Sequence, residues 1–294
     1  MASKHVTVAL IQTSCSDDIE ANLEKTFSQI REAAAGNGAQ IIILQELFAW
    51  PYFCREVDER YFNWAESVPG PVTSRFEKLA EELGVVIVAS LFEKRAPGLY
   101  HNTAAVIDAD GKYLGKYRKM HIPEDPGFHE KFYFTPGDLG YSVFATRYGR
   151  IGVLICWDQW YPEAARITAM MGADLLVYPT AIASLPDEAG DKSRQYLQAW
   201  QTIQKSHAIA NGCFVASVNR TGKENQLSFW GHSFISGPFG EILAEGDDNE
   251  QTIACDIDLS SLDRHRTTWP FYRDRRIDTY HAVTSRWLDT NDNS

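Results

Sequence analysis

The sequence predicts one layered α/β domain in which buried strands alternate with helices. Short apolar runs of strand length recur along the chain, and segments with apolar residues at helical spacing separate them. No linker, low-complexity tract or internal repeat interrupts this order. The chain of 294 residues is compatible with a single core, so we expect one domain over residues 1–294.

The first half of the chain shows the alternation clearly. Residues 41–44, IIIL, are apolar throughout, as expected of a strand buried on both faces. Ile19, Leu23 and Phe27 lie at helical spacing, and a Gly-Asn-Gly sequence ends that helix. The Asp-Gly of DADGK predicts a hairpin turn. The predicted elements are strands 6–11, 41–44, 85–91, 103–107 and 113–117, and helices 19–35 and 73–83.

The second half follows a segment, residues 118–138, that contains three prolines and no recognisable element. Loops of this length in compact domains are usually functional. The alternation then resumes, with Pro162 suited to a first helical turn. The predicted elements are strands 151–155, 175–178, 214–218, 229–236 and 253–257, and helices 162–171 and 192–210.

The composition argues against several classes of protein. A net charge of −11 without a basic block disfavours nucleic acid and anionic membranes as partners. No apolar run reaches the roughly 18–20 residues of a membrane helix, and residues 1–14 are typical of a strand rather than a secretory signal. The five cysteines are scattered, without a CxxC pair, which favours a reduced, cytoplasmic protein.

Three ionisable residues stand where predicted strands end. Glu46 follows strand 41–44, Lys119 follows strand 113–117, and Cys156 follows strand 151–155. In layered α/β folds, chemistry gathers at the carboxyl ends of strands. A fourth candidate, Glu130, lies in an aromatic part of the long loop.

Cys156 is a candidate nucleophile because a helix begins a few residues later, as in a nucleophile elbow. The Trp157 N–H is then a candidate oxyanion donor. Glu46 suits a general base, Lys119 suits an oxyanion cation, and Glu130 is a candidate desolvated carboxylate. Taken singly, each residue also fits a structural role: a buried apolar cysteine, a paired carboxylate or a solvated charge. A metal site is disfavoured because His121, His129 and Cys156 lack zinc-ligand spacing.

Four stretches, AQIIILQELF, YLGKYRKMHIP, HEKFYFTPGD and IGVLICWDQWYPEAARI, resemble the nitrilase superfamily of carbon–nitrogen hydrolases in their order along the chain. The resemblance implies that Glu46 is the general base, Lys119 the oxyanion cation and Cys156 the nucleophile, with Glu130 as an electrostatic support. It implies no cofactor and no metal. A non-catalytic binding protein and a redox sensor remain alternatives, the latter without a resolving cysteine nearby in the sequence.

The resemblance also implies a fold and an assembly. The family fold is a four-layer α-β-β-α sandwich, and two subunits usually pair into an eight-layer homodimer. The C-terminal tail, about residues 259–294, commonly joins the subunit interface. We therefore expect a homodimer or a higher homo-oligomer.

Within the superfamily, the same stretches are most similar to the N-carbamoylputrescine amidohydrolases, which release putrescine, CO2 and ammonia. Hydrolases of N-carbamoyl amino acids resemble one another in carrying an arginine just after the nucleophile, whereas here no cation follows Cys156 until Arg166. A small substrate with a cationic amine is therefore expected. The candidate substrate-binding residues are Asp125, His129, Trp157, Asp158, Trp160 and Glu188, with Asp187 in addition.

One departure from that pattern concerns the residues after YPTAIA. The plant-type enzymes have Ser-Glu-Pro where this chain has Ser184-Leu185-Pro186, so Asp187 or Glu188 would have to replace the missing glutamate. Hydrolysis of another linear amide or carbamoyl compound, as by an ω-amidase or a β-ureidopropionase, remains the alternative. A nitrilase is a weaker one.

Overall fold

The computed structural model describes residues 4–289, which form two six-stranded sheets and a small third sheet. In the first sheet, β1, β2 and β3 run parallel, while β4, β5 and β15 pair antiparallel with their neighbours. The strand order is β15 (Gln251–Asp258), β1 (His5–Gln12), β2 (Ile41–Leu44), β3 (Val86–Ala96), β4 (Leu99–Ile107) and β5 (Tyr113–Arg118).

The second sheet has a parallel centre made of β7, β8 and β10, flanked by antiparallel strands. Its order is β14 (Ile242–Glu245), β13 (Phe234–Ser236), β10 (Phe214–Val218), β8 (Leu175–Pro179), β7 (Arg150–Val153) and β6 (Val143–Ala145).

The third sheet corrects one sequence prediction. The single strand expected over residues 229–236 is two strands in different sheets, because the backbone turns at Gly231 and His232, which both have positive φ angles. The first of these strands, β12, belongs to the small sheet, which consists of β11 (Thr221–Glu224), β12 (Leu227–Trp230) and β9 (Ala183–Ser184).

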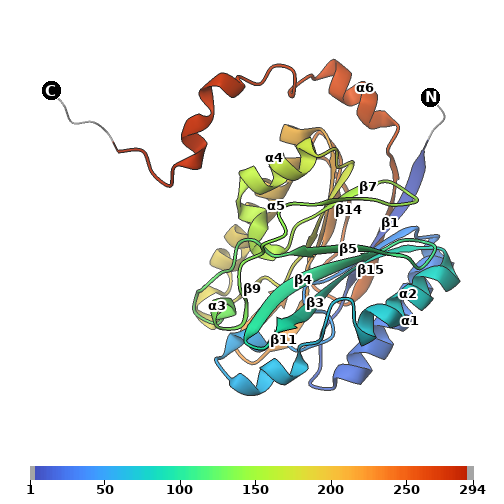
Figure 1. Ribbon diagram of the computed structural model, residues 1–294, viewed down its shortest axis with the longest axis vertical. Coiled ribbons are helices and arrows are strands. Elements are labelled where there is room, and N and C mark those ends of the chain that lie inside the picture. Colours follow the sequence, from blue (N-terminus) through green and yellow to red (C-terminus); the bar gives the residue numbers. More distant parts are fainter. Residues whose placement is uncertain (1–3, 290–294) are drawn as a thin grey trace.

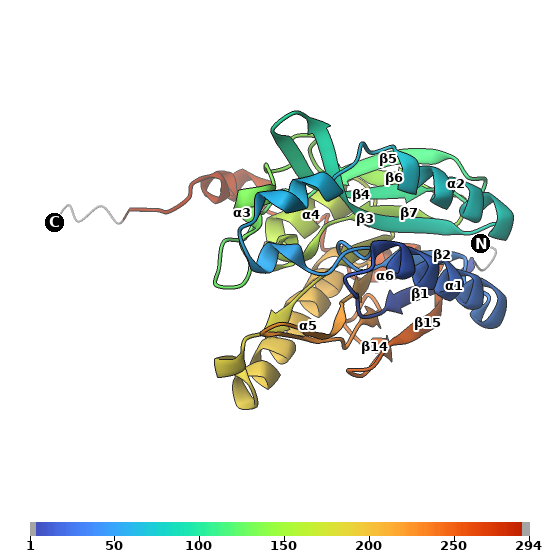
Figure 2. The same ribbon diagram turned by 90° about the horizontal axis from the view of Figure 1, so that it is seen from below.

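Helices cover the outer faces of the two large sheets (Figures 1 and 2). On one side lie α1 (Ile19–Asn37) and α2 (Pro71–Leu83), and on the other lie α4 (Pro162–Met170) and α5 (Asp191–Asn211). Sequence reasoning missed α3 (Glu130–Tyr133) in the long loop and α6 (Ser261–Thr268) near the end. The described part of the chain also contains six short 3-10 helices: η1 (Phe53–Arg55), η2 (Glu59–Trp64), η3 (Cys156–Trp160), η4 (Pro186–Glu188), η5 (Ile277–Thr279) and η6 (His281–Thr284).

Strand β2 shows why its sequence is apolar throughout. Ile41 and Ile43 pack in the core between the two large sheets, whereas Ile42 and Leu44 pack in the core under α1 and α2. Side chains of a strand alternate between its two faces, so both faces of β2 are buried, as predicted. The layers are thus helix, sheet, sheet and helix, which confirms the predicted four-layer α-β-β-α sandwich.

The strand directions place the predicted site residues together. Strand β5 runs in the same direction as β2 and β3, because it is separated from β3 by one antiparallel neighbour. The segments after β2 and β5 therefore emerge at the same edge of the first sheet. The segments after β7, β8 and β10 likewise leave one edge of the second sheet.

After α6 the chain first packs on α4 and α5, where the Tyr272 hydroxyl donates to the Asn211 carbonyl and Arg166 lies over the Tyr272 ring. Its last described part then extends away from the sheets (Figures 1 and 2). Residues 290–294 of the predicted interface tail lie outside the described residues. Among residues 4–289, the helices are all too short or too polar to cross a bilayer.

Candidate active site

Cys156 occupies a strained turn between β7 and α4. It is the first residue of η3, is buried, and has a φ angle of 42°, in the left-handed region that non-glycine residues rarely adopt. Such a conformation costs about 1–3 kcal/mol and persists only when the surroundings hold it. The strand–turn–helix expected around the cysteine is therefore present.

Glu46 follows β2 and is fully buried. Its Oε1 atom accepts hydrogen bonds from Lys119 Nζ at 2.7 Å and from Asn102 Nδ2 at 2.7 Å. Its Oε2 atom is buried and has no hydrogen-bond partner within residues 4–289. One carboxylate oxygen is thus anchored, and the other is left to accept a proton.

Lys119 directly follows β5, and its ammonium group lies between two carboxylates. Nζ is 2.7 Å from Glu46 Oε1 and 2.6 Å from Glu130 Oε2. Burial alone would lower the pKa of Lys119, but the attraction of Glu130 and Glu46 outweighs it and raises that pKa well above its usual value. Lys119 is therefore a fixed cation.

Glu130 opens the short helix α3 and completes the cluster. Its Oε1 atom accepts a hydrogen bond from the Tyr52 hydroxyl at 2.8 Å, and its Oε2 atom accepts one from Lys119. Burial and the nearby Glu46 carboxylate raise the pKa of Glu130 to about 7, although Lys119 opposes this.

The thiol of Cys156 belongs to the same electrostatic cluster. Burial raises its pKa well above the usual value, Glu46 raises it further, and Lys119 lowers it. At neutral pH the resting side chain is therefore the thiol, which needs a base before it can act as a nucleophile.

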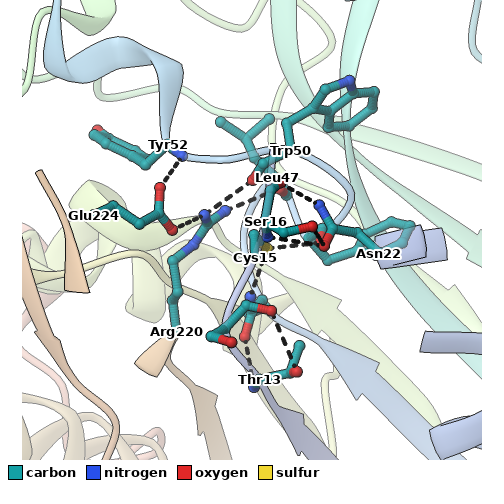
Figure 3. A network of polar contacts seen from close by, with 12 residues as sticks. Thr13, Cys15, Ser16, Asn22, Leu47, Trp50, Tyr52, Arg220 and Glu224 are labelled. Atoms are coloured by element: carbon teal, nitrogen blue, oxygen red, sulfur yellow. Dashed lines mark hydrogen bonds and ion pairs between the residues drawn. The ribbon is translucent and has the colours of Figure 1, made fainter. Parts of the chain in front are cut away.

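Arg220 holds the loop that carries Glu46 (Figure 3). This fully buried residue follows β10, and its NH2 atom donates to the Leu47 carbonyl at 2.9 Å and the Glu46 carbonyl at 3.2 Å. NH1 donates to the Trp50 carbonyl at 2.9 Å. Leu47 has a φ angle of 50°, so the guanidinium contacts carbonyls on either side of a strained turn.

Glu224 neutralises Arg220. Its Oε1 atom is 2.6 Å from Arg220 NH1, and its Oε2 atom accepts the Tyr52 N–H at 2.5 Å. Tyr52 in turn donates its hydroxyl to Glu130. The Arg220–Glu224 pair thus supports both Glu46 and, through Tyr52, Glu130.

A cavity of about 630 Å³ opens beside Cys156, a size typical of small-molecule sites. Cys156 and Glu130 lie in its wall with many apolar and aromatic residues. Of the predicted substrate-binding residues, those that line it are Asp125, Trp157, Trp160, Asp187 and Glu188.

Two predicted substrate-binding residues are placed elsewhere. Asp158 is fully buried, its carboxylate accepts the backbone N–H groups of Ile155 and His121, and it is not among the lining residues. His129 is not among the lining residues, and its Nδ1 atom instead lies 2.8 Å from Glu124 Oε1.

Sequence reasoning missed the supporting residues Tyr52, Asn102, Arg220 and Glu224. One signal was available for Arg220, which follows a buried strand in the same way as Glu46 follows β2. Asn102 lies within β4, where nothing in the local sequence distinguishes a polar site residue from a polar strand residue.

The structure defines a layered α/β protein with a buried thiol beside two buried carboxylates, and comparisons with known proteins place the chain in a family. The carbon-nitrogen hydrolase family model matches residues 7–267. The chain therefore belongs to the carbon-nitrogen hydrolase family, as the sequence motifs predicted.

Individual relatives match almost the whole chain. An N-carbamoylputrescine amidase of Solanum lycopersicum is 47% identical, over 96% of this chain and 97% of the relative. A citrullinase of Francisella tularensis is 38% identical, over 96% of this chain and 99% of the relative. The crystal structure of a carbon-nitrogen hydrolase from Helicobacter pylori G27 is 42% identical with a TM-score of 0.94, over 97% of this chain and 100% of that one.

Proposed function

We propose that the protein hydrolyses a carbon–nitrogen bond of a linear carbamoyl or amide compound, with Cys156 as nucleophile and N-carbamoylputrescine as the preferred substrate. One observation carries the proposal. The Lys119 ammonium is held between Glu46 and Glu130 in a buried cluster with the Cys156 thiol, while Glu46 Oε2 has no partner within the described part of the chain.

The first half of the reaction follows from this arrangement. Glu46 Oε2 takes the thiol proton, and Cys156 Sγ attacks the carbonyl carbon. Lys119, with the Trp157 N–H, stabilises the oxyanion that forms. The tetrahedral intermediate then expels one nitrogen, which Glu46 protonates, and a thioester-like acyl-enzyme remains.

Water completes the reaction. Glu46 removes a proton from water, which attacks the acyl carbon and releases the Cys156 sulfur to be reprotonated. With a carbamoyl substrate the product is a carbamic acid, which breaks down to CO2 and the second amine. For N-carbamoylputrescine the products are putrescine, CO2 and ammonia.

The charges around the cavity support a cationic amine at the far end of the substrate. Asp125, Asp187 and Glu188 line the cavity with Trp157 and Trp160, and a carboxylate or an aromatic face attracts an ammonium group. No arginine is among the lining residues. The similarity to an N-carbamoylputrescine amidase of Solanum lycopersicum agrees with this assignment.

A second candidate substrate carries a carboxylate as well as an amine, as citrulline does. Three donor atoms on cavity-lining residues are buried without a hydrogen-bond partner in residues 4–289: Gln159 Nε2, Trp160 Nε1 and Trp230 Nε1. Unpaired donors beside a cavity favour a ligand with acceptor oxygens there. The similarity to a citrullinase is consistent with this alternative.

Ammonia release from a panel of substrates tests the assignment. The panel is N-carbamoylputrescine, L-citrulline, N-carbamoyl-β-alanine, a linear ω-amide and an aryl nitrile. We expect the highest kcat/KM for N-carbamoylputrescine, and a higher value for citrulline would select the second candidate. Cys156→Ala and Cys156→Ser proteins should remain folded and inactive, so wild-type turnover by either would refute the nucleophile.

We further propose that residues 1–294 form one catalytic domain that assembles into a homodimer through α4, α5 and the tail. Exposed apolar side chains on these segments support the interface: Ile167, Met170, Ile209, Tyr280, Val283, Trp287 and Leu288. Light scattering of the full chain should give the mass of a dimer or a larger oligomer. Met170→Glu with Val283→Glu should lower that mass, and a monomeric wild-type chain would contradict the proposal.

A further inference from the structure

Asp158 connects the two segments that carry Lys119 and Cys156. Its Oδ2 atom accepts the Ile155 N–H at 2.9 Å and the Tyr117 hydroxyl at 2.7 Å. Its Oδ1 atom accepts the His121 N–H at 3.0 Å and lies 2.7 Å from His121 Nδ1. One buried carboxylate therefore has contacts in both segments.

The positions of these partners along the chain are informative. Tyr117 and His121 stand two residues before and two residues after Lys119. Ile155 directly precedes Cys156, and Asp158 follows it within the same 3-10 helix. The segment around Lys119 leaves the first large sheet, whereas the Cys156 turn leaves the second. Asp158 thus joins the two sheets at the point where the reactive groups meet.

The surroundings keep this connection rigid. Burial, together with the Asp158 carboxylate, raises the pKa of Tyr117 well above its usual value, so its hydroxyl stays a donor. The His121 ring stacks on Tyr161 with their centroids 3.7 Å apart and their planes 8° from parallel. The bond from Ile155 to Asp158 also closes the turn in which Cys156 holds its positive φ angle.

We propose that Asp158 is a positioning residue that sets the separation of the Lys119 ammonium and the Cys156 thiol, acting through Tyr117 and His121 on one side and Ile155 on the other. The inference rests on the proposed role of Cys156 as a nucleophile. It assigns Asp158 no contact with substrate. Removing the connection should therefore impair the chemical step more than substrate binding.

Asp158→Asn is the direct test. Both oxygens of the carboxylate accept hydrogen bonds, and an amide of the same shape must place its NH2 group against the donors at one of these two positions. We expect kcat to fall about 100-fold, the effect of a displacement of about 1 Å in an active site. KM should stay within about 3-fold of the wild-type value, since the remote carboxylates of the cavity are unchanged.

A second readout does not depend on the identity of the substrate. Cys156 faces three charged groups, Glu46, Lys119 and Glu130, of which Lys119 lowers its pKa. If Asp158→Asn moves Lys119 away, the pH dependence of Cys156 alkylation by iodoacetamide should shift to higher pH. Mass spectrometry of the labelled peptide follows Cys156 separately from the other four cysteines.

Two further variants keep the test decisive if Asp158→Asn does not fold. Tyr117→Phe removes one donor to Asp158 and should shift the alkylation profile in the same direction by a smaller amount. Tyr113→Phe is the matched control from the same strand, because its buried hydroxyl has no partner within the described residues. That control should leave the profile unchanged.

The outcomes separate the inference from the proposed function. If wild-type Cys156 reacts no faster than the other cysteines, the nucleophile assignment fails and the positioning role fails with it. The other case is that wild-type Cys156 reacts fastest, but the Asp158→Asn and Tyr117→Phe proteins both have the kcat of the wild-type protein and the same alkylation profile of Cys156. In that case only the positioning role is overturned.

Discussion

The Nζ atom of Lys119 lies 2.7 Å from Oε1 of Glu46 and leaves Oε2 of that carboxylate without a partner in residues 4–289. The two oxygens of the Glu46 carboxylate therefore differ: Oε1 is held by hydrogen bonds, and Oε2 has no hydrogen-bond partner in the described part of the chain. A lysine bound to both oxygens would compete with proton transfer. The same contact also fixes the Lys119 ammonium close to the proposed base, so one ion pair orients both groups.

Replacing Glu46 by glutamine should remove the proposed base and retain the shape of the site. We expect kcat to fall by about 10²–10⁴-fold, the usual contribution of a general base, while KM changes little. Steady-state ammonia release measures both constants. Glu82→Gln, which alters an exposed ion pair with Arg31, should leave them unchanged. Turnover near the wild-type rate by Glu46→Gln would exclude Glu46 as the base.

The pKa of Glu130 predicts that stability falls as pH rises. In the unfolded chain a glutamate ionises near pH 4.3, about the ordinary value, whereas burial in the folded protein raises its pKa to about 7. Between these values the unfolded state has already released a proton that the folded state retains. Raising the pH therefore favours unfolding, and the loss is complete above the folded pKa.

Urea unfolding of the wild-type protein and of Glu130→Gln, from about pH 5 to about pH 8, measures this effect. The free energy of unfolding of the wild-type protein should decline relative to that of the variant as pH rises. A difference that stays constant over this range would mean that Glu130 has no raised pKa in the folded state.

Arg220→Met should destabilise the protein more than the loss of an exposed ion pair. The change removes the closer of the two cations that Glu224 contacts, leaving Arg55 at 3.8 Å, and removes the donors to three loop carbonyls. Breaking a buried pair in this way costs about 3–5 kcal/mol. Denaturant unfolding measures the cost, and the exposed pair of Arg194 with Asp191 supplies the control. Arg194→Met should change stability by about 0–1 kcal/mol. If Arg220→Met and Arg194→Met lowered the free energy of unfolding equally, this would argue against a structural role for the buried Arg220–Glu224 pair.

Glu188→Gln should weaken the proposed recognition of an amine selectively. Loss of one charged partner should lower kcat/KM for N-carbamoylputrescine about 10-fold or more. A neutral analogue that ends in a methyl group should be unaffected. Asp191→Asn alters a nearby exposed carboxylate that is not among the cavity-lining residues, and should affect neither substrate. If Glu188→Gln lowered kcat/KM equally for both substrates, Glu188 would support the shape of its loop rather than bind the amine.

The elements with strong local signals were predictable from sequence. The apolar run of β2 and the spacing of α1 fixed both elements to within two residues at each end, because burial requires these patterns. The junction at Gly231 was missed, since β12 and β13 are both apolar and only their pairing partners show that they belong to different sheets. Short strands such as β6 and β14 depend on their neighbours rather than on their own sequence.

Some site residues could be predicted from the sequence and others could not. The sequence motifs indicated Glu46, Lys119, Glu130 and Cys156, and the structure brings these four into one cluster. The placement of Asp158 outside the cavity lining could not be predicted, for a physical reason. An acidic residue close to a candidate nucleophile has the same local sequence whether it points into the cavity or back toward β5. Its direction depends on Tyr117 and His121, which lie far away in the chain.

The antiparallel pair of β1 and β15 joins the first and the last of the described strands, with His5 opposite Asp258 and Gln12 opposite Gln251. During synthesis, β1 must therefore wait for β15, the last of the described strands in chain order. Until then, one edge of β1 stays open beside apolar side chains, an arrangement prone to wrong pairing. The time that the ribosome takes to reach β15 thus sets how long this edge of β1 lacks its native partner.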